Sequence, residues 1–403
     1  MTNGFIGALI RGLYINVTGK PHAVVFYDWE VVVPKNALKI EINLSDNEKS
    51  AAGIIRASYK NWLLTNPEQD KKVPIPSCAA LTANGKNLGV YWIGENIDSA
   101  RKTQNEKNGS HLVEYHAPDY ETINPARRAD VVKNKIALVT GGAQGIGEEI
   151  VRGLAACGAF VFIADLNFEG AKKLSKEINF KEERTASAPL QVNVSNEESV
   201  QAMFEYAAIT AGGIDLCVSN AGVLKAGSVL EQELGDFKFV TDINYTGFFV
   251  ICKYAGRLLR AQNLTAPAWL TDIIQVNSKS GLEGSNKNGA YAGGKFGGLG
   301  LTASFAMELI EYGIKVNAVC PGNFLDGPLW SDPDKGLFVQ YLKQGKVSGA
   351  KTIKDVRDFY ESKVPMKRGC TGKDLVRAIL YIIEQEYETG QAVPVTGGQI
   401  MLH

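Results

Sequence analysis

The sequence has no charge imbalance, few histidines and no long apolar run, and each absence excludes a class of function. Lys plus Arg and Asp plus Glu number 43 each in 403 residues, so no net charge favours nucleic acid or an acidic membrane surface. No stretch of about 20 uninterrupted apolar residues occurs, and no membrane span is predicted. The four histidines have no metal-ligand spacing, so no metal site is predicted: His22, His111, His116 and His403.

The cysteines do not indicate disulfides or metal ligands either. They form no Cys-x-x-Cys pair and most lie inside apolar runs, as small hydrophobic residues do in a reducing compartment: Cys78, Cys157, Cys217, Cys252, Cys320 and Cys370. The apolar segment 1–17 has no basic leader and carries Arg11 mid-run, so it is not predicted to be a signal peptide. We therefore expect a cytoplasmic protein.

From about residue 132 the chain alternates short apolar runs with helix-periodic segments. The run "KIALVT" ends in glycines, "GEEIVRGLAACGA" has helical periodicity, and "FVFIAD" is apolar again. The alternation continues through "IDLCVSNAG", "DIIQVNS", "IKVNAVCPG" and "QAVPVTGG". Apolar strands alternating with helices predict an α/β fold, a Rossmann-type doubly wound parallel sheet covered on both faces, over residues 131–403.

Residues 1–130 have a different pattern and are predicted to form a smaller N-terminal α+β domain. Strands are expected at 22–34 and 87–94, and one helix at 50–64. The boundary is placed in 115–130, where prolines and charges interrupt any periodicity. No motif in this part indicates a chemistry.

A glycine-rich turn, "TGGAQGIG", follows the first strand of the second part. Gly141, Gly145 and Gly147 allow a tight bend, close approach of a pyrophosphate and close packing of the next helix. Asp165 ends the next strand, where a carboxylate can accept hydrogen bonds from ribose hydroxyls and repels a 2′-phosphate. Since the turn offers Gln144 and no cation, NAD is favoured over NADP.

Tyr291 and Lys295 lie four residues apart in "YAGGK", so on a helix both side chains lie on one face. Alone, such a pair is usually a solvated surface pair. Ser278, placed just beyond the apolar run "DIIQV", adds a hydroxyl at a strand's carboxyl end, where parallel sheets bind ligands. Asn220 and Asn244 lie near other predicted strand ends, although each could be only a capping or turn residue.

The motifs "TGGAQGIG", "SNAG", "DINYTG", Ser278 with "YAGGK", "AVCPG" and "VTGGQI" occur in the order found in the short-chain dehydrogenase/reductase family, which this sequence resembles over about 133–403. The resemblance implies that Tyr291 is the general base in oxidation and the general acid in reduction. It also implies that Lys295 lowers the pKa of Tyr291 and holds the nicotinamide ribose, that Ser278 orients the substrate oxygen, and that Asn244 supports Lys295 through water.

The resemblance further implies a set of cofactor contacts. Pro321 and Gly322 would abut the nicotinamide, and Asn193 would contact the adenine edge where the family often has aspartate. The segment after Pro321 also lacks the threonine that the family usually carries there. The predicted NAD-binding residues are Gly141, Gln144, Gly145, Ile146, Gly147, Asp165, Asn193, Val194, Asn220, Ala221, Gly222, Tyr291, Lys295, Pro321 and Gly322.

Within the family, "VNSKSG", "KVPMKRGC" and "TGQAVPVTGGQIM" are similar to segments of sorbitol-6-phosphate 2-dehydrogenases, which implies interconversion of sorbitol 6-phosphate and fructose 6-phosphate. A phosphate needs cations, and Lys363, Lys367 and Arg368 are candidates that could equally be solvated surface charges. Because they adjoin cleft motifs, Lys225 and Lys279 are favoured. The predicted substrate site is Lys225, Lys279, Ser278 and Asn323, and 323–360 is typical of a mobile lid.

Other functions stay open. The substrate could be an unphosphorylated polyol, another sugar phosphate or a 3-oxoacyl group. A non-catalytic dinucleotide-binding regulatory protein is disfavoured because Ser278, Tyr291 and Lys295 are all present. The expected partners are a small-molecule sugar phosphate or polyol and further copies of the chain in a dimer or tetramer. Residues 1–130 could be an oligomerisation arm, a regulatory domain or a remnant of a fused enzyme.

Overall fold

The computed structural model describes residues 2–401 except 28–33, 35, 44, 46, 67–71, 84–85, 107–109, 115–129, 335 and 344. Its centre is a seven-stranded parallel sheet in the order β13-β12-β11-β10-β7-β8-β9. The strands are β7 Ile136–Thr140, β8 Phe160–Asp165, β9 Ser187–Gln191, β10 Leu216–Ser219, β11 Thr271–Val276, β12 Ile314–Pro321 and β13 Ala392–Val395. The predicted α/β fold with a doubly wound parallel sheet is confirmed.

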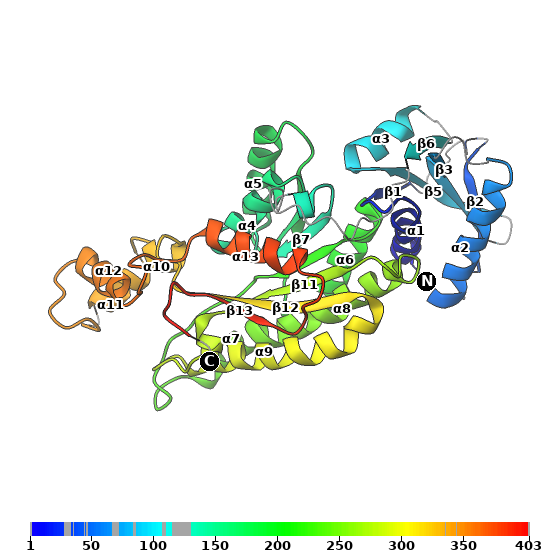
Figure 1. Ribbon diagram of the computed structural model, residues 1–403. Helices are drawn as coiled ribbons and strands as arrows, with labels where there is room; N and C mark the ends of the chain where they lie inside the picture. The colour runs from blue at the N-terminus through cyan, green and yellow to red at the C-terminus, as the bar shows by residue number, and fades with distance from the viewer. Residues whose placement is uncertain are drawn as a thin grey trace.

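Helices cover both faces of this sheet (Figure 1). One face is packed by α4 Gly145–Ala156, α5 Phe168–Lys181 and α13 Gly372–Glu384. The other is packed mainly by α6 Glu197–Ala211, α8 Gly247–Asn263 and α9 Gly289–Leu309, with α7 Leu234–Thr241 beside α9. The order of strands reverses between β7 and β10, so their carboxyl ends flank the crevice in which such sheets bind ligands.

A separate group of short helices follows β12. They are α10 Pro328–Ser331, α11 Leu337–Lys343 and α12 Ile353–Ser362. We call the described residues between 323 and 363 the lid; they include the predicted lid 323–360, whose mobility stays a prediction. Figure 1 shows these helices (orange) at one end of the molecule, beyond the sheet. The lid has an apolar cluster of its own, in which the buried members are Leu325, Trp330, Leu337, Phe338, Val347 and Val356.

The N-terminal region contains a small sheet in the order β1-β5-β4-β2 and a two-stranded ribbon, β3-β6. Its elements are α1 Asn3–Thr18, β1 Ala23–Tyr27, β2 Leu38–Glu41, α2 Glu48–Leu63, β3 Lys72–Pro76, β4 Cys78–Ala83, β5 Lys86–Gly94, α3 Ile97–Glu106 and β6 Ser110–Glu114. The expected helix and the second expected strand are present as α2 and β5. The first strand is β1, and 28–33 of that prediction lie outside the described residues.

Helix α1 joins the small sheet to the large one. It packs on α6 and α8, and it is buried without interruption from Ile6 to Ile15, which explains why its sequence is apolar on every side. One apolar cluster contains Ala8, Ala23 and Ile97 together with residues of the large sheet. The proposed boundary lies mostly in 115–129, outside the described residues, so the division into two domains stays a prediction.

A buried ion pair fixes α1 at the amino ends of the central strands. Arg11 Nη2 lies 2.7 Å from Asp215 Oδ2, and neither side chain is exposed. Arg11 also donates to Gln262 Oε1 at 2.6 Å, while Asp215 accepts from Ile136 N at 2.7 Å and Trp269 Nε1 at 3.1 Å. Both charges are therefore compensated in a site that excludes water.

No helix among the described residues has the length and apolar character needed to cross a membrane.

Candidate active site

The glycine-rich turn between β7 and α4 is shaped for a pyrophosphate. Gly145 has φ 59°, a left-handed conformation that favours glycine. A Cβ on Gly147 would lie 2.0 Å from the carbonyl oxygen of Gly141, so no larger residue fits there. Gln144 caps α4 without a side-chain hydrogen bond, which leaves backbone amides at the helix N-terminus for an anion. The turn thus fits the diphosphate of a dinucleotide.

Asp165 lies beside this turn at the end of β8 and is 9% exposed. Its Oδ2 accepts from Ala143 N at 2.9 Å, and its Oδ1 accepts from Asn167 N at 2.8 Å. Each carboxylate oxygen keeps a lone pair for a further donor, such as a ribose hydroxyl. The carboxylate thus both braces the turn and remains able to bind a ribose.

We expect Asp165→Ala to weaken NAD binding by about tenfold or more while changing NADP binding little, because a hydrogen bond to a charged group contributes about 1.5–3 kcal/mol. The measurement is the Michaelis constant for each cofactor. Asp165→Asn, which keeps the side chain's shape, is the matched control for loss of the hydrogen bonds from Ala143 N and Asn167 N that brace the turn. Unchanged selectivity between NAD and NADP in Asp165→Ala would refute the cofactor assignment.

Asn220, just after β10, connects two parts of the cofactor crevice. Its Nδ2 donates to Thr140 O at 3.0 Å and to Gly141 O at 2.9 Å, and the backbone amides of Asn220 and Ala221 donate to Thr140 Oγ1. Its side chain therefore holds the glycine turn against β10. The predicted contact of Asn220, Ala221 and Gly222 with the cofactor stays a prediction.

The residues after β9 and β12 also reach the carboxyl end of the sheet. Asn193 Oδ1 accepts from Ser195 N at 3.1 Å and from Ser195 Oγ at 2.7 Å, and Val194 is buried. Gly322 N donates to Val395 O at 2.9 Å, which ties the segment after Pro321 to β13. The adenine contact of Asn193 and the nicotinamide contacts of Pro321 and Gly322 stay predictions.

Three of the predicted catalytic residues meet at the carboxyl end of β11. Ser278 follows this strand and its side chain forms a hydrogen bond with Tyr291. Lys295 Nζ lies 5.6 Å from the centroid of the Tyr291 ring and donates to Val276 O at 2.9 Å. A hydroxyl, a phenol and an ammonium are thus gathered at one point, which is the set that acid–base chemistry at a carbinol needs.

Burial dominates the ionisation of this set in the protein alone. It raises the pKa of Tyr291, while the hydrogen bond from Ser278 lowers it. Burial also lowers the pKa of Lys295 to about 8. Lys295 is not among the causes of the Tyr291 shift, so the expected lowering of the Tyr291 pKa by Lys295 stays a prediction for the cofactor complex.

These pKa shifts predict the direction in which the rate of oxidation changes with pH. Oxidation requires the deprotonated phenol, so its rate should rise with pH through the pKa of Tyr291. Ser278→Ala removes the hydrogen bond that lowers this pKa and should move the rising limb to higher pH, in addition to reducing the rate. The profile of kcat against pH measures it, and a limb displaced to lower pH would contradict it.

Asn244 is placed by an irregular turn. It lies in the π-helical turn Asp242–Thr246 that precedes α8, a form often found at functional sites. Its Oδ1 accepts from Val223 N and its Nδ2 donates to Val223 O, both at 2.8 Å. The amide therefore holds the chain after β10, and its proposed water link to Lys295 stays a prediction.

Asn277 is a buried polar residue of this site that sequence reasoning missed, although it stands in the quoted "VNS". Its Oδ1 accepts from Ser278 N at 2.8 Å, and its Nδ2 donates to Lys295 O at 2.9 Å and Gln275 Oε1 at 2.7 Å. Since Lys295 Nζ bonds Val276 O, two hydrogen bonds join α9 to the end of β11. Asn277 thus sets the spacing between the serine and the lysine.

We expect Asn277→Asp to lower kcat about tenfold or more, because the carboxylate keeps the bond from Ser278 N but faces two oxygens where Nδ2 donated. Asn317→Asp is the matched control, since that amide is equally buried in β12 but donates to Glu388 O and accepts from Gln391 N. The control should lose stability and retain kcat. An equal loss of kcat in both variants would show that Asn277 is only structural.

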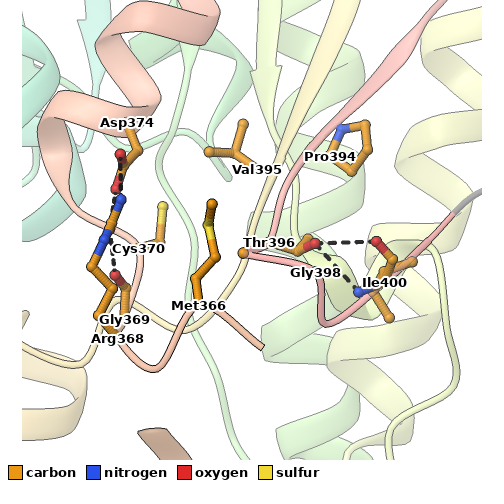
Figure 2. Close-up of a pocket in the computed structure, with 11 residues that line it drawn as sticks. Met366, Arg368, Gly369, Cys370, Asp374, Pro394, Val395, Thr396, Gly398 and Ile400 are labelled. Atoms are coloured by element: carbon orange, nitrogen blue, oxygen red, sulfur yellow. Dashed lines mark hydrogen bonds and ion pairs between the residues drawn. The ribbon is translucent and has the colours of Figure 1, made fainter. Parts of the chain in front are cut away.

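A cavity of about 320 Å³ lies between the segment 366–374 and the segment 394–400. Figure 2 shows Arg368 and Asp374 on one side of it and Thr396 bonded to Ile400 on the other. Arg368 makes two hydrogen bonds to Asp374, at 2.6 and 3.0 Å. Its charge is thereby compensated, which makes Arg368 a poor candidate for a phosphate ligand.

The other predicted substrate residues differ in whether their polar groups already form ion pairs or hydrogen bonds within the protein. Lys225 forms an ion pair with Asp236, and Lys367 donates to Ser362 O at 2.9 Å. Asn323 O accepts from Cys370 N at 2.9 Å, which anchors the start of the lid. Lys279 is half-buried next to Ser278, and among the described residues no carboxylate lies within ion-pair distance of it. Lys279 is the candidate that the structure leaves available beside the catalytic set.

Among the described residues, no group of three or more His, Cys, Asp or Glu side chains is arranged to hold a metal ion.

Comparison with known proteins agrees with this geometry. The short chain dehydrogenase family model matches residues 135–332. The sorbitol-6-phosphate 2-dehydrogenase of Escherichia coli (strain K12) is 36% identical over 270 residues, covering 66% of this chain and 99% of that protein. The 3-oxoacyl-[acyl-carrier-protein] reductase of Aquifex aeolicus (strain VF5) is 28% identical over 269 residues, with 66% and 98% covered.

Among solved structures, the crystal structure of sorbitol-6-phosphate 2-dehydrogenase from Erwinia amylovora has a TM-score of 0.61 and 36% identity, covering 66% of this chain and 100% of that one. The region before the sheet is thus extra to these relatives. Together with the glycine turn and the Ser278, Tyr291 and Lys295 set, these matches show that the chain belongs to the short-chain dehydrogenase family.

Proposed function

We propose that this protein interconverts sorbitol 6-phosphate and fructose 6-phosphate with NAD. Its family membership makes it an oxidoreductase acting on a CH–OH group. The observation that carries the choice of substrate is Lys279, a half-buried lysine beside Ser278 with no carboxylate in ion-pair distance among the described residues. A phosphorylated substrate supplies the missing negative charge. The relatives named sorbitol-6-phosphate 2-dehydrogenase support the same choice.

The catalytic residues act on the hydroxyl of the reacting carbon. In oxidation, Tyr291 Oη accepts the hydroxyl proton while Ser278 Oγ hydrogen-bonds the same oxygen and orients it. Lys295, held by Val276 O, places its ammonium where it stabilises the phenolate. In reduction, Tyr291 returns the proton to the carbonyl oxygen. The dinucleotide, when bound at the glycine turn and Asp165, supplies the hydride chemistry.

NAD is proposed rather than NADP because of Asp165. A buried carboxylate beside the glycine turn accepts hydrogen bonds from ribose hydroxyls and repels a 2′-phosphate. Gln144, the cap of α4, carries no charge that could compensate such a phosphate.

We also propose that the chain forms a homo-oligomer, a dimer or tetramer, in the cytoplasm. Large apolar side chains on α8 and α9 are exposed in the single chain, among them Phe249, Phe296 and Met307, and association would bury them. Sedimentation equilibrium measures the state of assembly.

The test of the function is the initial rate of NADH or NADPH formation with sorbitol 6-phosphate, sorbitol, mannitol 1-phosphate and a 3-hydroxyacyl thioester, each with NAD and with NADP. A strong preference for sorbitol 6-phosphate with NAD is expected. Activity on another member of the panel would retain the role of Tyr291 and overturn the substrate. Inactivity on all four would overturn the proposal.

A further inference from the structure

The lid presents two lysines on one aromatic surface. Lys346 Nζ lies 3.8 Å from the centroid of the Tyr341 ring. Lys363 Nζ lies 4.2 Å from the centroid of Phe359 and 6.0 Å from that of Tyr360. The Tyr341 and Tyr360 rings are 5.5 Å apart, so both ammonium groups are held above neighbouring rings by cation–π contacts. The lid therefore carries two oriented cations.

Two further lysines lie in the segment that carries the catalytic residues. Lys279 directly follows Ser278, and Lys287 lies four residues before Tyr291, in the segment that joins β11 to α9. Gly227 N donates to the carbonyl of Lys287 at 2.9 Å, which fixes this segment against the chain after β10. Both lysines are thus placed by the elements that place the catalytic serine and tyrosine.

The charges of lysines in this group act on the pKa values of two of its members, Lys279 and Lys346. After burial, the charge of Lys363 contributes to a lowered pKa of Lys279, and the charge of Glu283 opposes it. The charges of Lys287 and Lys363 likewise contribute to a lowered pKa of Lys346, where burial is again the largest cause. Lys363 therefore lies near enough to Lys279 and Lys346 for its charge to act on both.

In the part of the chain that the structure describes, these charges are not compensated by ion pairs, although the charge of Glu283 acts on Lys279. Among the described residues, none of Lys279, Lys287, Lys346 and Lys363 forms an ion pair with Asp or Glu. By contrast, Lys354 on α12 of the same lid pairs with Asp358. Repulsion among uncompensated cations is relieved by a multiply charged anion at their centre.

The lid also contacts the cofactor turn. A Cβ on Gly145 would lie 3.6 Å from Pro328 Cδ, at the start of α10. Asp326 and Arg357 pair at 2.6 Å and join the two ends of the lid. The start of the lid therefore lies close to the glycine turn.

We propose that Lys279, Lys287, Lys346 and Lys363 form a binding site for the phosphomonoester end of the substrate, with two cations from the lid and two from the catalytic segment. The inference rests on the proposed function and deepens it, because it assigns phosphate recognition to the lid rather than to Lys225, Lys367 or Arg368. A phosphate bridging both sides also closes the lid, so that the substrate's phosphate contributes to positioning the reacting carbon.

The test compares three full-length variants, Lys346→Met, Lys363→Met and Lys354→Met. Methionine removes the charge and keeps an apolar stem over the aromatic rings, and Lys354 is the matched control from the same lid. We expect kcat/KM for sorbitol 6-phosphate to fall about tenfold in each of the first two variants. The value for unphosphorylated sorbitol should change less than about twofold, and Lys354→Met should match the wild type.

Inorganic phosphate provides a second measurement that does not depend on the sugar. It should bind the wild-type protein in calorimetry and raise the rate of sorbitol oxidation, and both effects should be lost in Lys346→Met and Lys363→Met. If the wild type oxidises sorbitol 6-phosphate and the two variants lose no more than Lys354→Met, the lysine site is overturned and the proposed function stands.

The test also recognises the case in which the proposed substrate is wrong and the lysine site is right. A wild type that is inactive on sorbitol 6-phosphate but binds inorganic phosphate through Lys346 and Lys363 would retain the anion site and overturn the substrate. Absence of both activity and phosphate binding would overturn both proposals.

Discussion

Tyr291→Phe should reduce turnover by about 100- to 10,000-fold while leaving NAD binding intact. The substitution removes one oxygen from a buried ring, and with it the proton acceptor and the hydrogen bond with Ser278. The ring, its packing and the position of Lys295 are unchanged, so the glycine turn and Asp165 should bind NAD as before. The measurements are kcat from NADH absorbance and the NAD dissociation constant from calorimetry.

The matched control is Tyr245→Phe. Tyr245 also packs against α9, where a Cβ on Gly297 would lie 2.7 Å from its ring, and we assign no chemistry to its hydroxyl. This variant should retain wild-type kcat. Residual activity above about a tenth of wild type in Tyr291→Phe would place the acid–base group elsewhere, and a non-catalytic dinucleotide-binding protein would show no turnover in any variant.

Arg11→Met should destabilise the protein by about 3–5 kcal/mol, the usual result of removing one member of a buried ion pair. Asp215 would remain fully buried, with hydrogen bonds from Ile136 N and Trp269 Nε1 but no positive charge beside it. The unfolding free energy from urea titration measures the loss. We expect kcat per folded molecule to change little.

Two variants make this test specific. Arg56→Met, on α2, removes an exposed arginine that also links the N-terminal region to α8, through Leu264 O at 3.3 Å, and it should lose less than about 1 kcal/mol. Arg11→Met/Asp215→Asn removes both charges and should recover part of the lost stability. Equal unfolding free energies for Arg11→Met and Arg56→Met would mean that the ion pair is unimportant.

The same contacts bear on removal of residues 1–130. Without α1, the apolar surfaces of α6 and α8 and the carboxylate of Asp215 would be uncovered. We therefore expect the truncated chain to be insoluble or unable to bind NAD, which would mean that the N-terminal region belongs to the core. A soluble, NAD-binding fragment would instead support two independent domains.

The central sheet could be predicted because its signals are local, whereas the gathering of Ser278 with Tyr291 and Lys295 is expected from the order of motifs that resembles the short-chain dehydrogenase/reductase family. Each strand is a short apolar run ended by glycine or a polar residue, and the pattern that identifies the glycine turn is complete within eight residues. Carboxyl ends of parallel strands meet at one edge, so residues just after different strands converge without any knowledge of their contacts.

The role of α1 could not be predicted in this way. An apolar helix sequence does not show which elements will bury it, here the small sheet on one side and α6 and α8 on the other. The partner of Arg11 is also 204 residues away. Whether a lysine is ion-paired or free to bind an anion also depends on contacts that are not local in the sequence. Lys225 adjoins the "SNAG" motif, as expected, but it pairs with Asp236 after the intervening turn, and Lys346 is placed over the Tyr341 ring by the fold of the lid.

The large sheet has different tasks at its two ends. The Arg11–Asp215 pair lies at the amino ends of β7 and β10, whereas the glycine turn, Ser278 and the loop after Pro321 lie at the carboxyl ends. Changes at one end alter how firmly the chain is held together, and changes at the other alter what it recognises. Substitutions in the N-terminal region should thus change the unfolding free energy, and with it the highest working temperature, without retuning the chemistry at the opposite edge.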